Sequence, residues 1–385
     1  MRPLRIAVDG RVLGHRGVGR YLANTLRAAA RLKHPHEFLI YLGPVSKSEL
    51  VPKDPRFHAK RLPGGHPAIA EQWALPRAAR ADGADLIYFP DNSGAIFPGM
   101  PMVLALLDTM WTRPLDQAIA KPTFRQRLQD RYRKFVCPRA AAAATQVITI
   151  SQHSGRCLDE LLGLQAPKLT VVDLAADPDL RTPLPIAEAA RLRKAMGLDA
   201  KTPYVLASGA ADKRKNVDRV IQAFAQAQRQ DKRLATAVLV ITSLRAGEGA
   251  TTTYVETATQ AGVVGCLRFV GYVDDAQMKA LYQGALCFAF PSLWEGFGLP
   301  LLEAFALGCP VLTSAEGSLP EVGGKAVVYV DPYSVESIAR GISETAFGRK
   351  KKALVAAARQ REKRYTWDAC ARQHLQVFES AVRSS

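Results

Sequence analysis

The most informative segment of the chain is Pro291-Ser-Leu-Trp-Glu-Gly-Phe-Gly-Leu-Pro-Leu-Leu-Glu-Ala-Phe-Ala-Leu-Gly-Cys-Pro-Val-Leu-Thr-Ser314. The apolar run at residues 286–290 before it is typical of a buried strand. Glycines then permit a tight turn, and Pro300 suits the first turn of a helix that ends by Gly308. A second strand is expected at residues 311–313. This order is the unit of a parallel α/β sheet, in which ligands bind at the carboxyl ends of strands.

The same alternation of strand and helix extends over the whole chain and predicts an α/β, doubly wound fold. Strands are expected at residues 4–8, 38–42, 86–89, 103–107 and 147–150, and in a second series at 205–207, 238–241, 267–270, 286–290, 311–313 and 326–330. Their nearly continuous apolar character indicates parallel strands that are covered on both faces.

A chain of 385 residues is longer than a single core usually becomes, so two domains are expected. Three prolines lie in the polar stretch 175–185, between the two series of strands. We therefore predict a Rossmann-like domain at residues 1–178, a linker at 179–200 and a second Rossmann-like domain at 201–365. A last helix at 366–385 would begin at Thr366 or Asp368.

The net charge of +17 is the most unusual bulk property, and it favours an anionic partner. The six cysteines are scattered without a Cys-x-x-Cys pair, which indicates neither a zinc site nor a disulfide framework. The first residues lack the apolar stretch of a signal peptide, and no apolar run is long enough for a transmembrane helix. A cytoplasmic location is expected, with association at the cytoplasmic face of a membrane as an option.

Two glutamates give the central segment its chemistry. Glu303 is the only charged residue from Gly296 through Ala315, and a carboxylate in so apolar a segment needs a partner or a ligand. Glu295 lies eight residues earlier, at the turn between strand and helix, so both carboxylates are expected to face one cleft. The alternative is that Glu303 favours the helix dipole from the first turn and that Glu295 is a solvated loop residue.

The run from Glu295 to Glu303 resembles the paired-glutamate motif of the retaining GT-B glycosyltransferases of family four (glycosyl transferases group 1), with a mannosyltransferase-like pattern. The resemblance implies two Rossmann-like domains that face a cleft, with the last helix crossing back at Trp367 to pack on the N-terminal domain. It also implies a donor-sugar contact by Glu295 and the following backbone, and a ribose contact by Glu303. The donor-binding backbone would comprise Gly296, Phe297, Gly298 and Leu299.

A second match is Ser208-Gly-Ala-Ala-Asp-Lys-Arg-Lys-Asn216, which resembles the family's glycine turn ending in Arg-Lys-Asn. The resemblance implies that Gly209 belongs to the donor site and that Arg214 and Lys215 bind the donor pyrophosphate. Two clustered cations near a helix N-terminus suit a diphosphate. Taken alone, the segment is more typical of a solvated basic loop, and its register with the glutamate motif is what favours the donor site.

A third match is Asp9-Gly-Arg-Val-Leu-Gly-His-Arg-Gly-Val-Gly-Arg-Tyr21, which resembles the family's glycine-rich loop near the transferred sugar. Gly17 and Gly19 are the candidate contacts, and their spacing is not that of a dinucleotide fingerprint. Weaker agreements are Glu71-Gln72 before Leu75-Pro76, residues 148–151, and Leu319-Pro-Glu321.

The chain departs from the family at one position. Members usually carry His-Asp after a strand of the N-terminal, acceptor-side domain, whereas this chain has Leu107-Asp108. The family's histidine contacts the donor sugar, often at the C6 hydroxyl, and leucine cannot hydrogen-bond. We therefore hypothesise a 6-deoxy sugar or a pentose in the donor. The alternative is that Leu107 is the last core residue of its strand and never meets the sugar.

The resemblance implies a retaining glycosyltransferase that moves a sugar from a nucleotide-diphosphate-sugar to a glycan or lipid-linked acceptor in surface polysaccharide synthesis. Glu295, Arg214 and Lys215 are the catalytic candidates, and the two cations would replace a metal, so we expect no obligatory metal or cofactor. A GT-B epimerase or phosphorylase fits less well. The alternative of another class is a non-catalytic nucleotide-sugar- or lipid-binding GT-B subunit, which Leu107 keeps open.

Residues 113–139 hold eight basic and two acidic residues. A helix there places Phe124, Leu128, Tyr132 and Phe135 on an apolar stripe, and Arg127, Arg131 and Lys134 on a basic one. Peripheral contact with an anionic membrane is one interpretation, and a solvated helix face is the other. No recognition motif accompanies the charge, so nucleic-acid binding is not expected.

Overall fold

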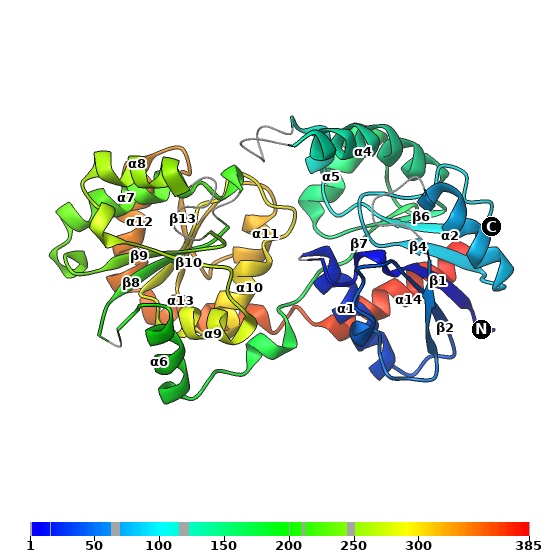
Figure 1. Ribbon diagram of the computed structural model, residues 1–385, viewed down its shortest axis with the longest axis horizontal. Coiled ribbons are helices and arrows are strands. Elements are labelled where there is room, and N and C mark those ends of the chain that lie inside the picture. Colours follow the sequence, from blue (N-terminus) through cyan, green and yellow to red (C-terminus); the bar gives the residue numbers. More distant parts are fainter. Residues whose placement is uncertain are drawn as a thin grey trace. The chain divides into compact units, whose positions relative to one another are not determined.

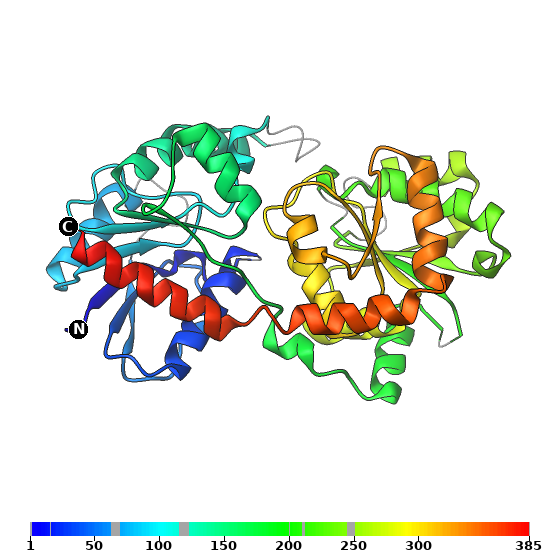
Figure 2. The ribbon, with the colours of Figure 1, turned by 180° about the vertical axis from the view of Figure 1, so that it is seen from behind.

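The computed structural model describes residues 2–15, 17–62, 70–114, 123–199, 201–209, 212–244 and 251–384. The described residues divide into two compact units. Unit 1 comprises the chain up to Pro114, residues 123–175 and residues 365–384, and unit 2 comprises Ala176–Arg364. Figures 1 and 2 show both units from opposite sides, each with helices on the two faces of a sheet.

Unit 1 is a seven-stranded parallel sheet in the order β3-β2-β1-β4-β5-β6-β7. Its strands are β1 (Arg5–Asp9), β2 (Glu37–Leu42), β3 (Phe57–Arg61), β4 (Leu86–Phe89), β5 (Met102–Ala105), β6 (Gln146–Thr149) and β7 (Leu169–Val171). Its helices are α1 (Val18–Arg31), α2 (Ala70–Ala81), α4 (Phe124–Ala143), α5 (Gln152–Leu162) and α14 (Trp367–Arg383), with short 3-10 turns η1 (Gly10–Val12), η2 (Ser48–Leu50) and η3 (Met110–Thr112).

Unit 2 is a six-stranded parallel sheet in the order β10-β9-β8-β11-β12-β13. Its strands are β8 (Tyr204–Ala207), β9 (Val238–Thr242), β10 (Leu267–Gly271), β11 (Cys287–Phe290), β12 (Val311–Ser314) and β13 (Val328–Val330). Its helices are α6 (Ile186–Ala195), α7 (Val217–Gln230), α8 (Thr251–Ala261), α9 (Asp275–Gly284), α10 (Leu299–Ala306), α11 (Leu319–Gly323), α12 (Val335–Phe347) and α13 (Lys351–Glu362). The 3-10 turns are η4 (Pro178–Arg181), η5 (Lys213–Lys215), η6 (Lys232–Leu234) and η7 (Val264–Cys266).

The central strands confirm the prediction of a doubly wound α/β fold. All residues of β4, β5, β8, β9 and β11 are buried, because helices cover both faces of each sheet. The sequence pattern missed β3 and β7, which are the outer strands of unit 1. In β3, apolar and polar residues alternate only weakly and most side chains are exposed, whereas all three residues of β7 are half-buried. Neither strand therefore carries the apolar run of a central strand.

The stretch predicted to be a linker is ordered structure and belongs to unit 2. Of the predicted linker, the described residues 179–199 contain most of η4 and all of α6, and α6 packs against α9. Gln283 of α9 accepts a hydrogen bond from the Leu184 backbone N–H at 3.0 Å and donates one to the Leu184 carbonyl at 3.1 Å. Pro185 marks the start of a helix rather than a flexible connection, since it is the residue that precedes the first turn of α6.

The C-terminal helix α14 packs along α1 within unit 1, as both ribbon views show. It begins where predicted, because the Thr366 hydroxyl accepts a hydrogen bond from the Ala369 backbone N–H. Its buried face carries His374, whose Nδ1 lies 2.8 Å from the Cys370 carbonyl oxygen and therefore donates. Nε2 then accepts from the Tyr21 hydroxyl at 2.6 Å, and Tyr21 also contacts Tyr88.

We expect this histidine to make stability fall under acid conditions. Burial lowers the pKa of His374 from 6.5 to about 4. Since the folded-state pKa lies below the unfolded one, the stabilisation is complete above pH 6.5 and is lost as the pH falls towards 4. The free energy of unfolding should drop by about 3 kcal/mol more in the wild type than in His374→Gln over this window. Urea unfolding at several pH values measures the drop, and equal slopes for the two proteins would contradict it.

Candidate donor and acceptor sites

The strand order of unit 2 brings the two strongest sequence motifs to one place. β8 and β11 are neighbours, while β9 extends the sheet on one side and β12 on the other. The connections after β8 and β11 therefore lead to opposite sides, and open α/β sheets bind ligands in a crevice at such a switch point, which is called the donor crevice below. The first loop carries Gly209, Arg214 and Lys215, and the second carries Glu295.

Lys215 and Glu295 form an ion pair across this crevice, with Nζ 2.5 Å from Oε1. Their side chains are only 16% and 10% exposed, so the pair is weakly screened by solvent. The Lys215 ammonium also lies 4.7 Å from the centre of the Phe290 ring. Gly209 has a φ of +83°, and a Cβ on it would lie 2.6 Å from Lys215 Cγ. The glycine of the turn thus makes room for the lysine stem.

Arg214 is held by Asp212, a residue that the sequence analysis did not assign. Its Nε lies 2.9 Å and 3.0 Å from the two Asp212 carboxylate oxygens, and Nη2 contacts the same carboxylate. The Arg214 carbonyl accepts the Leu293 backbone N–H at 2.8 Å, which joins the β8 loop to the β11 loop. The same Asp-x-Arg fork recurs at Asp9-x-Arg11, Asp54-x-Arg56 and Asp231-x-Arg233. The two-residue spacing in the sequence could therefore have revealed the pairing of Asp212 with Arg214.

The turn that carries Glu295 is held from a third loop, which follows β12. The backbone N–H and the hydroxyl of Ser318 both donate to the Glu295 carbonyl, at 3.2 Å and 3.0 Å. Gly317 packs against the Glu295 backbone, and a Cβ on it would lie 2.6 Å from the carbonyl oxygen. At the other end of the turn the Ser314 hydroxyl donates to the Ser292 carbonyl. Sequence spacing gave no signal for these contacts, because they join separate loops.

The helix after this turn places the remaining donor candidates. Gly298 precedes α10 with a φ of +100°, which favours glycine, and Leu299 begins the helix. Gly296 and Phe297 are buried, and Leu299 is half-buried.

Glu303 is the fifth residue of α10, so a place in the first turn is excluded. Its carboxylate is half-buried and accepts a hydrogen bond from the Tyr282 hydroxyl of α9 at 3.3 Å. The structure thus gives the two glutamates different partners, with Glu295 on Lys215 and Glu303 on Tyr282.

Unit 1 places its predicted residues at the carboxyl edge of its own sheet. Gly17 is exposed at the start of α1 with a φ of +71°, and Gly19 is buried where a Cβ would lie 2.6 Å from the Val12 carbonyl oxygen. β5 ends at Ala105, so Leu107 is not the last core residue of its strand but a half-buried residue beyond it. Asn92 accepts the Leu107 backbone N–H at 2.8 Å and donates to Asp108 at 3.3 Å.

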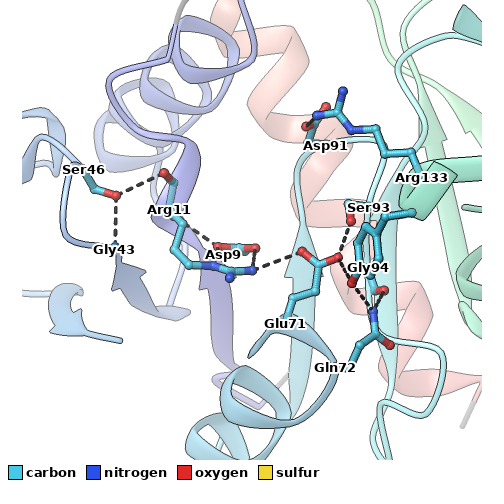
Figure 3. A network of polar contacts seen from close by, with 11 residues as sticks. Asp9, Arg11, Gly43, Ser46, Glu71, Gln72, Asp91, Ser93, Gly94 and Arg133 are labelled. Atoms are coloured by element: carbon cyan, nitrogen blue, oxygen red, sulfur yellow. Dashed lines mark hydrogen bonds and ion pairs between the residues drawn. The ribbon is translucent and has the colours of Figure 1, made fainter. Parts of the chain in front are cut away.

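A buried polar network lies at the same edge, and Figure 3 shows most of its members. Asp9 binds Arg11 through a fork at 2.7–2.8 Å, and Arg11 Nη2 also lies 3.3 Å from Glu71. The other Glu71 oxygen accepts from the hydroxyls of Ser93 and Tyr132, the latter at 2.7 Å. Asp9, Arg11, Glu71, Ser93 and Tyr132 are called the Glu71 network below. In the sequence, Glu71-Gln72 was visible as a weak agreement and Asp9 and Arg11 as part of the glycine-rich motif, but nothing linked the two.

The basic helix predicted at the surface is α4, and one of its apolar residues is placed differently from the prediction. Phe124, Leu128 and Phe135 are 83%, 59% and 54% exposed, whereas Tyr132 turns inward to Glu71. Arg127 and Arg131 are exposed, and Lys134 pairs with Asp130 at 2.8 Å. Among the described residues, no helix combines the length and the apolar character needed to span a membrane.

Comparison with known proteins assigns a family to this arrangement. Residues 188–361 match the model of the glycosyl transferases group 1, and residues 16–175 match the glycosyl transferase 4-like domain. The chain is 29% identical over 264 residues to O-antigen chain mannosyltransferase B of Escherichia coli, which covers 67% of this chain and 66% of that protein. It is 28% identical over 239 residues to a D-inositol 3-phosphate glycosyltransferase of Corynebacterium aurimucosum, covering 61% of this chain and 56% of that protein. Both matches span somewhat less than two thirds of the relative's own length.

Solved structures agree with the fold. Sucrose-phosphate synthase from Thermosynechococcus elongatus superposes over 100% of both chains with a TM-score of 0.74 and 20% identity. HepE from Anabaena, in complex with UDP and glucose, covers 98% of this chain and 100% of that chain with a TM-score of 0.70 and 18% identity. The two family models follow one another along the sequence, one in each unit. This protein therefore belongs to the glycosyl transferases group 1 family and has the GT-B fold.

Proposed function

We propose that the protein is a retaining glycosyltransferase that moves a sugar from a nucleotide-diphosphate-sugar to a glycan or lipid-linked acceptor in surface polysaccharide synthesis. The observation that carries the proposal is the Lys215–Glu295 pair at the crevice of unit 2, beside Arg214. The Escherichia coli relative, an O-antigen chain mannosyltransferase, supports the pathway and makes mannose and its 6-deoxy form the first donor sugars to compare.

In this proposal the protein acts by positioning and by stabilising charge. Lys215 and Arg214 neutralise the diphosphate as it leaves, while Asp212 and Glu295 hold the two cations in place beforehand. Glu295 contacts the donor sugar and Glu303 the ribose hydroxyls. The departing phosphate deprotonates the acceptor hydroxyl on the same face of the sugar, which retains the anomeric configuration. No metal takes part, so turnover should be insensitive to EDTA.

Turnover of a donor panel tests the proposal. The panel comprises UDP-, GDP- and ADP-sugars, first without acceptor and then with simple glycosides, and NMR of the product gives the anomeric configuration. GDP-mannose and its 6-deoxy counterpart GDP-rhamnose are compared directly, because Leu107 offers no hydrogen bond to a C6 hydroxyl. A preference for GDP-mannose would rule out the 6-deoxy hypothesis. Donor binding without hydrolysis or transfer would favour the non-catalytic alternative.

Replacing Glu303 with alanine should weaken nucleoside-diphosphate binding about 10- to 100-fold, because a charge-assisted hydrogen bond to the ribose is lost. Calorimetric titration measures the affinity. Glu336→Ala is the matched control, since Glu336 is an exposed residue in the first turn of α12 and does not belong to the loops after β8, β11 and β12. Equal affinities for Glu303→Ala and the wild type would remove the ribose assignment.

We also propose that α4 binds the surface of anionic membranes. Phe124 and Leu128 expose apolar surface next to the exposed guanidinium groups of Arg127 and Arg131. Sedimentation with phosphatidylglycerol vesicles should exceed that with neutral vesicles and should fall with salt. Arg127→Gln with Arg131→Gln should reduce binding by roughly fivefold per charge removed. Lys352→Gln, an exposed change in the other basic segment, is the control. Equal partitioning to both vesicle types would leave α4 as a solvated face.

A further inference from the structure

The strand order of unit 1 gives a topological switch point equivalent to that of unit 2, which is called the β1–β4 crevice below. β1 and β4 are neighbours, with β2 on one side and β5 on the other, so the loops after β1 and β4 diverge. Asp9, a member of the Glu71 network, is the last residue of β1, and Asp91 lies shortly after the end of β4. A ligand site is therefore expected at this edge on topological grounds alone.

Arg133 of α4 presents a guanidinium group at this edge. Its Nη2 lies 3.2 Å from Asp91 Oδ2, and its side chain is 37% exposed against 11% for that of Asp91. Within the part of the chain that the structure describes, the buried Nε of Arg133 has no hydrogen-bond partner. A buried donor without a partner costs free energy, and the 37% of the Arg133 side chain that is exposed can still donate to a ligand oxygen.

Glu71 fixes both residues of this pair through their neighbours. It accepts hydrogen bonds from Ser93, two residues from Asp91, and from Tyr132, adjacent to Arg133. Burial and the Glu71 carboxylate raise the pKa of Tyr132, so its hydroxyl stays protonated and continues to donate. Gln72 reinforces the same junction, because its side-chain nitrogen donates to Tyr132 and to the Gly94 carbonyl.

Charge identifies the class of ligand. Among the described residues, the Glu71 network and the Arg133–Asp91 pair together hold three carboxylates and two guanidinium groups, and this excess of one negative charge disfavours a phosphate. A neutral ion pair offers a donor and an acceptor side by side, which suits neighbouring hydroxyl groups. Burying so many charges is costly and is weak evidence for a stabilising role, which favours a functional reason for the cluster.

We propose that Arg133, oriented by Asp91, binds the hydroxyl groups of the sugar acceptor at the β1–β4 crevice, and that Glu71 is a positioning residue for this contact. The identification of this ligand as the sugar acceptor rests on the proposed glycosyltransferase function. The site itself, a binding site for a neutral sugar, rests only on the geometry of unit 1.

The test uses the full chain and ligand-observed NMR with methyl α-mannoside, rhamnoside, glucoside and galactoside, and with inorganic phosphate as a separate arm. The wild type should bind at least one glycoside, and Arg133→Met should weaken that binding at least about tenfold. Arg125→Met, an exposed arginine of the same helix, should bind like the wild type. Equal binding by Arg133→Met, no glycoside bound by the wild type, or binding of phosphate in place of glycoside would overturn the proposal.

Glu71→Gln and Tyr132→Phe test the positioning role. Both should raise the acceptor KM or glycoside Kd while leaving the nucleoside-diphosphate affinity unchanged, and circular dichroism should show an intact fold. Glu71→Asp should restore part of the binding, which a purely structural role in stability does not require. Loss of nucleoside-diphosphate affinity and of glycoside affinity together would count against positioning. A wild type that binds glycosides through Arg133 but no nucleoside diphosphate would refute the proposed function and leave this site standing.

Discussion

Replacing Lys215 with methionine should lower kcat by about 10²–10³-fold, because one preorganised cation is removed from the diphosphate leaving group. The side chain is 16% exposed and pairs with Glu295 at 2.5 Å, so the lost charge acts where solvent screening is weak. Methionine keeps much of the stem that packs beside Gly209. Steady-state turnover with the preferred donor measures the loss.

Lys213→Met is the control for this prediction. Lys213 lies in the same 3-10 turn, η5, and its side chain is exposed. The two variants remove the same charge from the chain, so a general effect of net charge on donor encounter would reduce turnover equally in both. A Lys215→Met protein with wild-type turnover would refute the role assigned to this lysine. Glu295→Ala should lower turnover more than it lowers nucleoside-diphosphate affinity.

Replacing Gly317 with alanine should disturb the Glu295 turn without touching any charged group. The φ of +62° costs a side-chain residue roughly 1–2 kcal/mol. The new Cβ would also lie 2.6 Å from the Glu295 carbonyl oxygen and 3.0 Å from its nitrogen. Relieving this overlap should cost about another 1–3 kcal/mol and should shift Glu295 relative to Lys215. We expect a lower unfolding midpoint and at least a tenfold loss of kcat.

Gly262→Ala separates the cost of the left-handed backbone from the cost of the overlap with Glu295. Gly262 has a φ of +77°, but a Cβ on it would meet nothing within 4 Å. It should therefore lose only the stability that the left-handed backbone costs, with normal turnover. Equal losses of stability and activity in the two variants would show that the contact with Glu295 has no special importance.

Much of the fold could be predicted because periodicity and turn residues report local burial. The apolar runs of the central strands, the helix opened by Thr366 and the turn before Pro300 were all visible in the sequence. β3 and β7 were not, because an edge strand is exposed and lacks such a run. The prediction of a linker was wrong because prolines occur at helix starts as well as in loops. Only the packing of α6 against α9 distinguishes these two cases.

The sequence by itself determined the alternation of strands and helices and the motifs around Gly209, Arg214, Lys215, Glu295 and Glu303. Each of these depends on neighbours within a few positions along the chain. The tertiary structure alone decided which side chains meet. Ser318 reaches the Glu295 carbonyl, Tyr282 reaches Glu303, and Glu71 joins Ser93 to Tyr132. These pairs lie on different loops or helices, and their meeting depends on strand order and on helix packing, which no local pattern encodes.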